Sequence, residues 1–111
     1  MEKPKAKKTG IDVANEDQKF YLATWKQRQN EYGKCQCEEC GDWLYYSATH
    51  ISHNLSRGAH PKLRHHPDNV TILCLMHHTQ WEDSHKRKRM RIYPEKLKVM
   101  QKLLEDQQKI P

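Results

Sequence analysis

The chain has 111 residues, a length that suits one small domain with an appended arm. Hydrophobic residues make up 35% of the sequence and charged residues 31%, which excludes a large apolar core and favours another source of stability, such as a bound metal ion. Twenty Lys and Arg against fourteen Asp and Glu give a net charge of +6. This charge favours a polyanionic partner, although a well-solvated basic surface would show the same composition.

The sequence predicts neither a membrane span nor export. The longest apolar run covers residues 70–76, far fewer than the ~20 residues that cross a bilayer. The first ten residues are basic but lack the apolar stretch of a signal peptide. The cysteines are therefore expected in a reducing compartment, where disulfides are disfavoured.

The N-terminal region is predicted to be an arm followed by a helix. Residues 1–14 are expected to form a basic flexible arm. Asn15 and Gln18 have the spacing of a capping box, and no helix breaker follows until Gly33, which predicts a first helix over about 15–33. Its apolar residues are expected to face the domain core: Phe20, Leu22, Trp25 and Tyr32.

Two short strands are expected in the middle of the chain, after a cysteine-rich turn. Aromatic and small residues over 43–51 predict the first strand, which should end near His50. The run 70–73 predicts the second strand. Residues 52–69 between them are polar and aperiodic, as expected of a long functional loop.

Two further helices are expected after the second strand. One should run from Cys74 to about Arg89. Pro94 fits the first position of the other, which continues to about residue 109. Leu97, Met100 and Leu104 recur in it at helical spacing, so its apolar face is expected to dock on the first helix.

Two pairs of metal-ligand residues carry the strongest signal in the sequence. Cys37 and Cys40 are separated by two residues and followed by a glycine, and Cys74 and His77 repeat the spacing. Together they offer the four donors of a tetrahedral Zn²⁺ site. Such a site would join distant segments of a chain that is poor in hydrophobic residues. The alternative is a set of unrelated core and surface cysteines.

The choice of ligands leaves two alternatives open. Cys35 competes with Cys37, but it lacks the two-residue spacer and the following glycine, so it is expected to be a free thiol. On the helical side, His78 competes with His77, since either can reach back from the first turn after Cys74.

The order His50, Asn69, His78, framed by the two ligand pairs, resembles the ββα-metal fold of HNH endonucleases, especially small phage and bacterial members. The resemblance covers about residues 37–81. It implies an α+β domain over 15–111, in which a zinc-stabilised ββα core at about 35–91 lies between flanking helices at about 15–33 and 94–109. The fourth zinc ligand here is His77, where the family usually has a cysteine.

The same resemblance implies catalytic roles. His50 is the expected general base, His78 the ligand of a catalytic divalent cation, and Asn69 the residue that braces the loop and helps hold His50 or the metal. Mg²⁺ or Mn²⁺ is the expected cation, with Ni²⁺ also compatible with a histidine ligand. Many family members place an Asp directly before the first His, and this chain has Thr49 there. The nearest substitutes for that Asp as a ligand are His53 and Asp68.

Basic residues near the motif are expected to contact the DNA backbone, although plain solvation explains such clusters equally well. The first group lies in the loop and the second follows the motif helix: Arg57, Lys62 and Arg64, then Lys86, Arg87, Lys88 and Arg89. Binding through the second group would depend strongly on salt and little on sequence.

The resemblance therefore implies a metal-dependent endonuclease that cuts duplex DNA with low sequence specificity, in the cytoplasm of a bacterial or phage-infected cell. The alternative is a non-catalytic zinc-stapled module that binds nucleic acid, which Thr49 favours. A third reading is an interaction subunit whose terminal helices join a larger phage or recombination assembly. The sequence does not distinguish nicking from double-strand cleavage, and it leaves the oligomeric state open.

Overall fold

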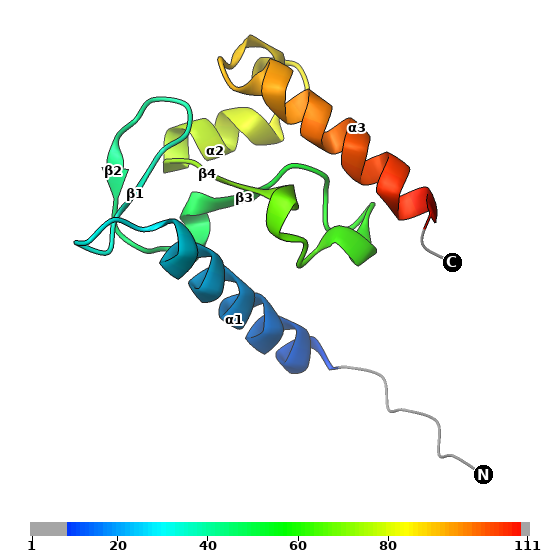
Figure 1. Ribbon diagram of the computed structural model, residues 1–111, viewed down its shortest axis with the longest axis horizontal. Helices are drawn as coiled ribbons and strands as arrows, with labels where there is room; N and C mark the ends of the chain where they lie inside the picture. The colour runs from blue at the N-terminus through cyan, green and yellow to red at the C-terminus, as the bar shows by residue number, and fades with distance from the viewer. Residues whose placement is uncertain (1–8, 110–111) are drawn as a thin grey trace.

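The computed structural model describes residues 9–109, so most of the predicted arm lies outside the described residues (Figure 1). The described part is a small α+β domain with three α-helices and two antiparallel sheets of two strands each. In chain order the elements are α1 (Gly10–Arg28), β1 (Cys35–Gln36), β2 (Trp43–Leu44), β3 (Ile51–His53), β4 (Val70–Ile72), α2 (Leu75–Glu82) and α3 (Tyr93–Lys109). No helix among these is long and apolar enough to cross a membrane.

The first helix begins earlier than predicted, because its cap is Thr9 and not Asn15. The Thr9 hydroxyl accepts a hydrogen bond from the backbone N–H of Asp12, whose carboxylate accepts one from the backbone N–H of Thr9. Residues 10–14 are therefore helical, which contradicts the expected arm there. The helix ends at Arg28 because the Asn30 side chain accepts hydrogen bonds from two following backbone N–H groups and turns the chain.

The single strand predicted over 43–51 is in fact divided between two sheets. β2 pairs with β1, and β3 begins only at Ile51. Between them Ser47 accepts a hydrogen bond from the backbone N–H of Thr49 and starts a 3₁₀ turn over Ala48–His50. His50 consequently precedes a strand, where the sequence predicted that it would end one.

β3, β4 and α2 follow one another as a hairpin and a helix. Ile51 pairs with Ile72 and His53 with Val70, and a 3₁₀ turn over Pro67–Asn69 leads directly into β4. The second strand and the place of Asn69 before it agree with the prediction. The long loop between the strands is not entirely irregular, because it contains this turn and another over Pro61–Leu63.

α2 is shorter than predicted. It ends at Glu82 because the Asp83 carboxylate accepts hydrogen bonds from the backbone N–H groups of His85 and Lys86, which bends the chain away from the helix axis. The basic run therefore forms a separate 3₁₀ turn, Lys86–Arg89.

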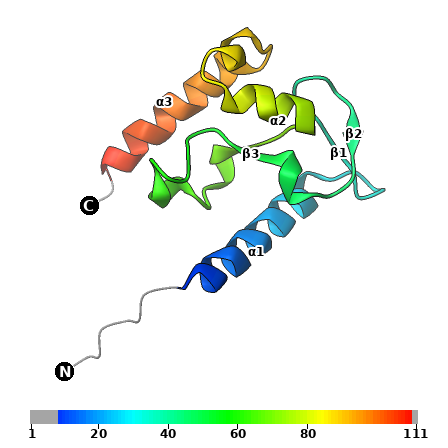
Figure 2. The ribbon, with the colours of Figure 1, turned by 180° about the vertical axis from the view of Figure 1, so that it is seen from behind.

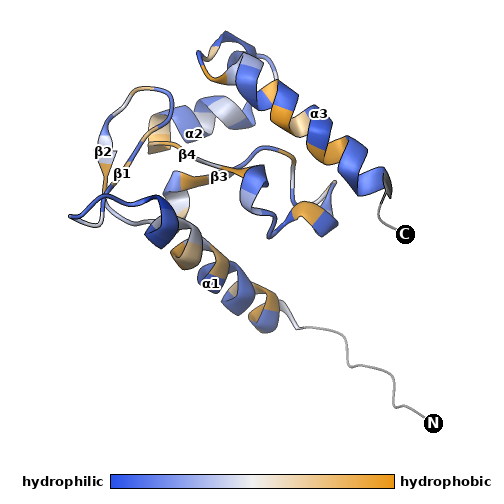
Figure 3. Cartoon of the chain, in the orientation of Figure 1, coloured by the Kyte–Doolittle hydropathy of each residue, from blue (hydrophilic) through white to orange (hydrophobic). Residues whose placement is uncertain are grey.

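Two apolar clusters lie on opposite sides of the hairpin. α1 contributes Tyr21 and Trp25 to the first, which includes Ile51, Val70 and Ile72. α3 contributes Met100 to the second, which is built around other residues: Cys37, Leu73, Trp81, Met90 and Ile92. The predicted docking of the last helix on the first is therefore wrong, and Figures 1 and 2 show α1 and α3 on opposite sides of β3. Hydrophobic and hydrophilic segments alternate along α3, as expected of a helix with one buried face (Figure 3).

One carboxylate anchors the long loop to α1. Asp17 is 7% exposed and accepts two hydrogen bonds from the Arg64 guanidinium, at 2.8 and 2.6 Å, and one contact of 2.7 Å from His65 Nε2. The hydrogen bonds from Arg64, and those from His65, hold the pKa of Asp17 well below its usual range, against the opposing effect of burial. The loop is thus tied to a helix that lies more than forty positions earlier in the chain.

Replacing Asp17 with Asn should lower the free energy of unfolding by about 2 kcal/mol, because the guanidinium groups of Arg64 and Arg57 lose their charged partner. For a domain of this size that is a fall of roughly 8 °C in melting temperature. Since folding depresses the pKa of Asp17, its contribution is complete above the unfolded pKa of about 3.9 and declines as the pH falls below it.

Thermal melts of the wild type and Asp17→Asn from pH 7 to pH 3 test this, with the exposed Asp106→Asn as the matched control. The difference in melting temperature should shrink at the acid end. A difference that stays constant over the range would contradict the assignment.

Candidate functional site

Four potential metal ligands gather between the β1–β2 turn and the start of α2. The donor atoms of Cys37, Cys40, Cys74 and His77 all lie within 4.8 Å of one another. His77 Nδ1 is 3.6 Å from Cys37 Sγ and 3.2 Å from Cys74 Sγ. Two ligands of a tetrahedral zinc are expected about 3.6 Å apart, so the spacing of these donors fits that metal.

Local structure explains why the donors converge. The backbone N–H of Gly41 donates to the carbonyl of Cys37, and Gly41 has a φ of +81°, a left-handed conformation that a side chain would strain. This tight turn brings the first two thiols to one side. Cys74 is the N-cap of α2 and His77 lies in its first turn, so the second pair is presented by the start of one helix.

Hydrogen bonds from the surrounding backbone favour ionisation of the Cys37 thiol. Burial alone would raise its pKa, but hydrogen bonds from the backbone N–H groups of Cys40, Cys74 and Glu39 outweigh that effect and lower the pKa to about 7. A thiolate is the form that binds metal, and three sulfurs with one imidazole are donors that Zn²⁺ prefers. The residues present therefore fit the structural zinc that the sequence predicts.

Cys35 lies outside this cluster, as expected. Its side chain is buried against α1, with Sγ 3.7 Å from the carbonyl oxygen of Trp25, and burial raises the pKa of its thiol. The residue thus belongs to the first apolar cluster and behaves as a small hydrophobic side chain.

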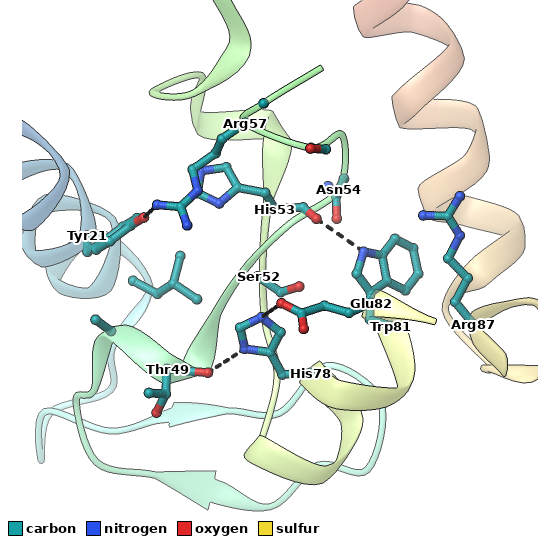
Figure 4. A pocket seen from close by; sticks show the side chains of 14 residues that line it. Tyr21, Thr49, Ser52, His53, Asn54, Arg57, His78, Trp81, Glu82 and Arg87 are labelled. Carbon is teal, nitrogen blue, oxygen red and sulfur yellow. Dashed lines mark hydrogen bonds and ion pairs between the residues drawn. The ribbon is translucent and has the colours of Figure 1, made fainter. Parts of the chain in front are cut away.

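A cavity of about 640 Å³ opens beside α2, between the start of β3 and the long loop (Figure 4). His78 lies on its wall, with Nδ1 against the backbone carbonyl oxygen of Thr49 and Nε2 3.0 Å from a carboxylate oxygen of Glu82. Because the carbonyl oxygen can only accept, Nδ1 donates to it, and Nε2 is the ring atom that faces the Glu82 carboxylate.

Glu82 is a candidate cation ligand that the sequence reasoning missed. Its signal was present, since Glu82 follows His78 by four residues on the same helix face. Two ligands 2.1 Å from an octahedral cation lie about 3.0 Å apart, which matches the separation of the two donor atoms. Of the two expected substitutes for the missing Asp, Asp68 does not line this cavity, whereas His53 lines it with its Nε2 2.9 Å from the Arg64 carbonyl oxygen.

The structure does not bring His50 and Asn69 into the cavity with His78. The His50 ring stacks on Trp25, with 6.2 Å between ring centroids, and its Nδ1 is 2.9 Å from the Tyr45 carbonyl oxygen. Asn69 is fully buried and braces the loop as expected: it donates to the carbonyls of Leu55 and Leu63 and accepts from the N–H of Leu55. No contact of Asn69 with His50 is found among the described residues.

Two arginines and one serine line the cavity and offer hydrogen-bond donors to it. Arg57 reaches Tyr21 Oη at 3.1 Å and forms an ion pair of 3.5 Å with Asp17, and its side chain is 46% exposed. Arg87 lies 5.8 Å over the Trp81 ring, and its Nε is buried without a hydrogen-bond partner. Ser52 is 1% exposed, and its hydroxyl is also unpartnered. All three residues line the cavity.

The other basic residues that were predicted to contact the DNA backbone do not line the cavity. The Arg64 guanidinium is held by Asp17, so this residue anchors the loop and is not free to bind a phosphate. The remaining basic residues are exposed to solvent: Lys62, Lys86, Lys88 and Arg89. Only Arg87 of the basic run therefore faces the cavity.

Searches against known proteins identify no relative. Neither a protein-family description, nor a curated protein, nor a solved structure gives a significant match to this chain.

Purified protein should contain about one Zn²⁺ per chain. Cys37→Ser and Cys74→Ser should lose the metal and unfold, because each removes a ligand of the only cluster of its kind in residues 9–109. Elemental analysis and circular dichroism provide the measurement. Cys35→Ser is the matched control and should keep its zinc; the reverse result for Cys35 and Cys37 would show that the ligand set is wrong.

Proposed function

We propose that the protein is a metal-dependent endonuclease of the HNH type, which hydrolyses phosphodiester bonds of DNA. The observation that supports this best is the His78–Glu82 pair, which lies in one cavity with two arginines and an unpartnered serine hydroxyl. The succession of hairpin and helix, with Asn69 before β4 and His78 on α2, has the order expected from the resemblance, whereas His50 precedes β3 and does not end a strand.

His78 and Glu82 would hold the catalytic cation. The carboxylate supplies the charge that Thr49 lacks, and a mixed nitrogen and oxygen donor pair suits Mn²⁺ or Ni²⁺ as well as Mg²⁺. When bound, such a cation stabilises negative charge on the phosphoryl and leaving oxygens. The bond from His78 Nδ1 to the Thr49 carbonyl orients the ring, so that Nε2 presents its lone pair.

The scissile phosphate would be positioned by Arg57, Arg87 and Ser52. A guanidinium makes charge-assisted hydrogen bonds to phosphate oxygens, and burial strengthens them. Arg87 is preorganised for this role, since its stacking on Trp81 restricts the side chain while Nε remains without a partner. The exposed lysines of the same run would contact flanking phosphates of the duplex without reading sequence.

Two histidines are candidates for the general base. His50 is the one that the resemblance implies, and its bond to the Tyr45 carbonyl places the proton on Nδ1 and leaves Nε2 free to accept one. His53 lines the cavity instead, and burial lowers its pKa, so that it is neutral at pH 7. We assign the role to His50 and treat His53 as the second candidate.

His78→Ala and Glu82→Gln should each reduce nicking of supercoiled plasmid at least about 100-fold with Mg²⁺, Mn²⁺ or Ni²⁺, because each removes a ligand of the catalytic cation. Gel electrophoresis of the plasmid gives the rate. His85→Ala is the control, since His85 is exposed and does not line the cavity. Binding of the plasmid without cleavage by the wild type under every cation would favour the non-catalytic module.

The same assay separates the two candidate bases. His50→Ala should lower the nicking rate by a factor of about 10² to 10⁴, while leaving the zinc content unchanged. His53→Ala should have a smaller effect on the rate. If His53→Ala abolishes nicking and His50→Ala does not, the base is His53, and the acid limb of the pH profile should then lie below the ordinary histidine pKa, because burial lowers the pKa of His53.

A further inference from the structure

The outer face of the β1–β2 hairpin carries exposed aromatic side chains. Cys35 pairs with Leu44, and both belong to apolar clusters, so the alternate residues point outward. Trp43 and Tyr45 are 53% and 73% exposed. Lys34 completes the face, with its ammonium 4.6 Å from the centre of the Tyr45 ring. We call this surface of Lys34, Trp43 and Tyr45 the aromatic face.

We propose that the aromatic face binds unpaired nucleobases of a single-stranded DNA segment by stacking. Trp43 lies in β2 and Tyr45 directly follows that strand. In an extended chain, rings two residues apart lie roughly 6.7 Å from each other on the same side, which suits successive bases of an extended DNA strand. Every base offers a flat face to such rings, so this binding tolerates any sequence. The proposal rests on the proposed function, because it specifies the kind of DNA that the nuclease acts on.

Charge favours this occupant over an apolar protein surface. The Lys34 ammonium already lies over one ring, and burying it under an apolar partner would remove it from water without a counter-charge. A phosphate backbone supplies that counter-charge while its bases stack on the rings. The net charge of +6 for the whole chain also favours a negatively charged nucleic acid over an apolar protein surface.

The aromatic face is continuous with the candidate site. The Tyr45 carbonyl receives the hydrogen bond from the His50 ring, and Thr49, four residues beyond Tyr45, lines the cavity. Four residues span at most about 14 Å, the length of about two nucleotides of an extended strand at the ring spacing of roughly 6.7 Å. A strand that stacks on the face would therefore reach the cavity within a few nucleotides, and we infer a preference for DNA with an unpaired segment beside the cut.

Tryptophan fluorescence tests the proposal directly. Of the three tryptophans, Trp25 and Trp81 are 2% and 1% exposed, and Trp43 is the exposed one. Because Trp81 lines the cavity, a Trp43→Phe variant assigns the quenching to Trp43. Titration with a ten-nucleotide oligothymidylate, without added divalent cation, should quench this emission. Tyr45→Ala should weaken the affinity at least about fivefold, the lower bound for the loss of one stacked base.

Tyr32→Ala is the matched control, because Tyr32 is 77% exposed but lies in the turn between α1 and β1 and is not part of the aromatic face. Trp43→Phe should lose the quenching yet keep most of its affinity, measured by the anisotropy of a labelled oligonucleotide. Zinc content and circular dichroism of each variant verify the fold. Equal affinities for Tyr45→Ala and the wild type, oligonucleotide binding without quenching, or equal quenching by a duplex of the same length would each overturn the proposal.

The experiment also separates this proposal from the proposed function. If the protein nicks plasmid but oligothymidylate does not quench its tryptophan emission, the proposed nuclease function stands and the stacking proposal is wrong. If oligothymidylate quenches the tryptophan emission in a way that depends on Tyr45, but the protein cuts no DNA with any cation, the stacking proposal stands and the proposed nuclease function is wrong.

Discussion

The structure depends on the convergence of four metal donors from two distant parts of the chain. The turn that holds Cys37 and Cys40 and the helix start that holds Cys74 and His77 are separated by the entire β3–β4 hairpin and its loop. Each apolar cluster contains only six buried residues, so a single bound cation would contribute a large share of the cohesion. Glu38 reinforces the same junction, since it exchanges two hydrogen bonds with the backbone of Ile72 in β4.

α2 serves both candidate cation sites. His77 and His78 are neighbours in the chain, and successive residues of a helix point about 100° apart. One ring therefore turns toward the cysteines and the other toward the cavity with Glu82. Fixing the start of this helix with a structural metal would fix the direction of His78 as well, so a small domain could orient the candidate His78–Glu82 pair with little core.

Sequence reasoning succeeded where the signal is local. The spacing of the ligand pairs, the run that forms β4 and the place of Asn69 before it could all be read from neighbouring residues. It failed where a contact depends on a partner that is distant in the sequence. Nothing near Arg64 indicates that Asp17 holds it, and the spacing of Leu97 and Met100 shows a buried face without saying which neighbour covers it. Glu82 is an exception, because its signal is local: it follows His78 by four residues on one helix, whereas the resemblance places the carboxylate ligand directly before His50.

The buried Asn69 side chain has a consequence for how this loop can evolve. The side chain makes three hydrogen bonds to the backbone of Leu55 and Leu63, and these hold the two ends of the loop together. The residues between these two points include the exposed run 56–59, whose backbone is not held by Asn69. Insertions and deletions are thus best tolerated at this tip, where natural variation in length would alter the reach of Arg57 without disturbing the hairpin beneath it.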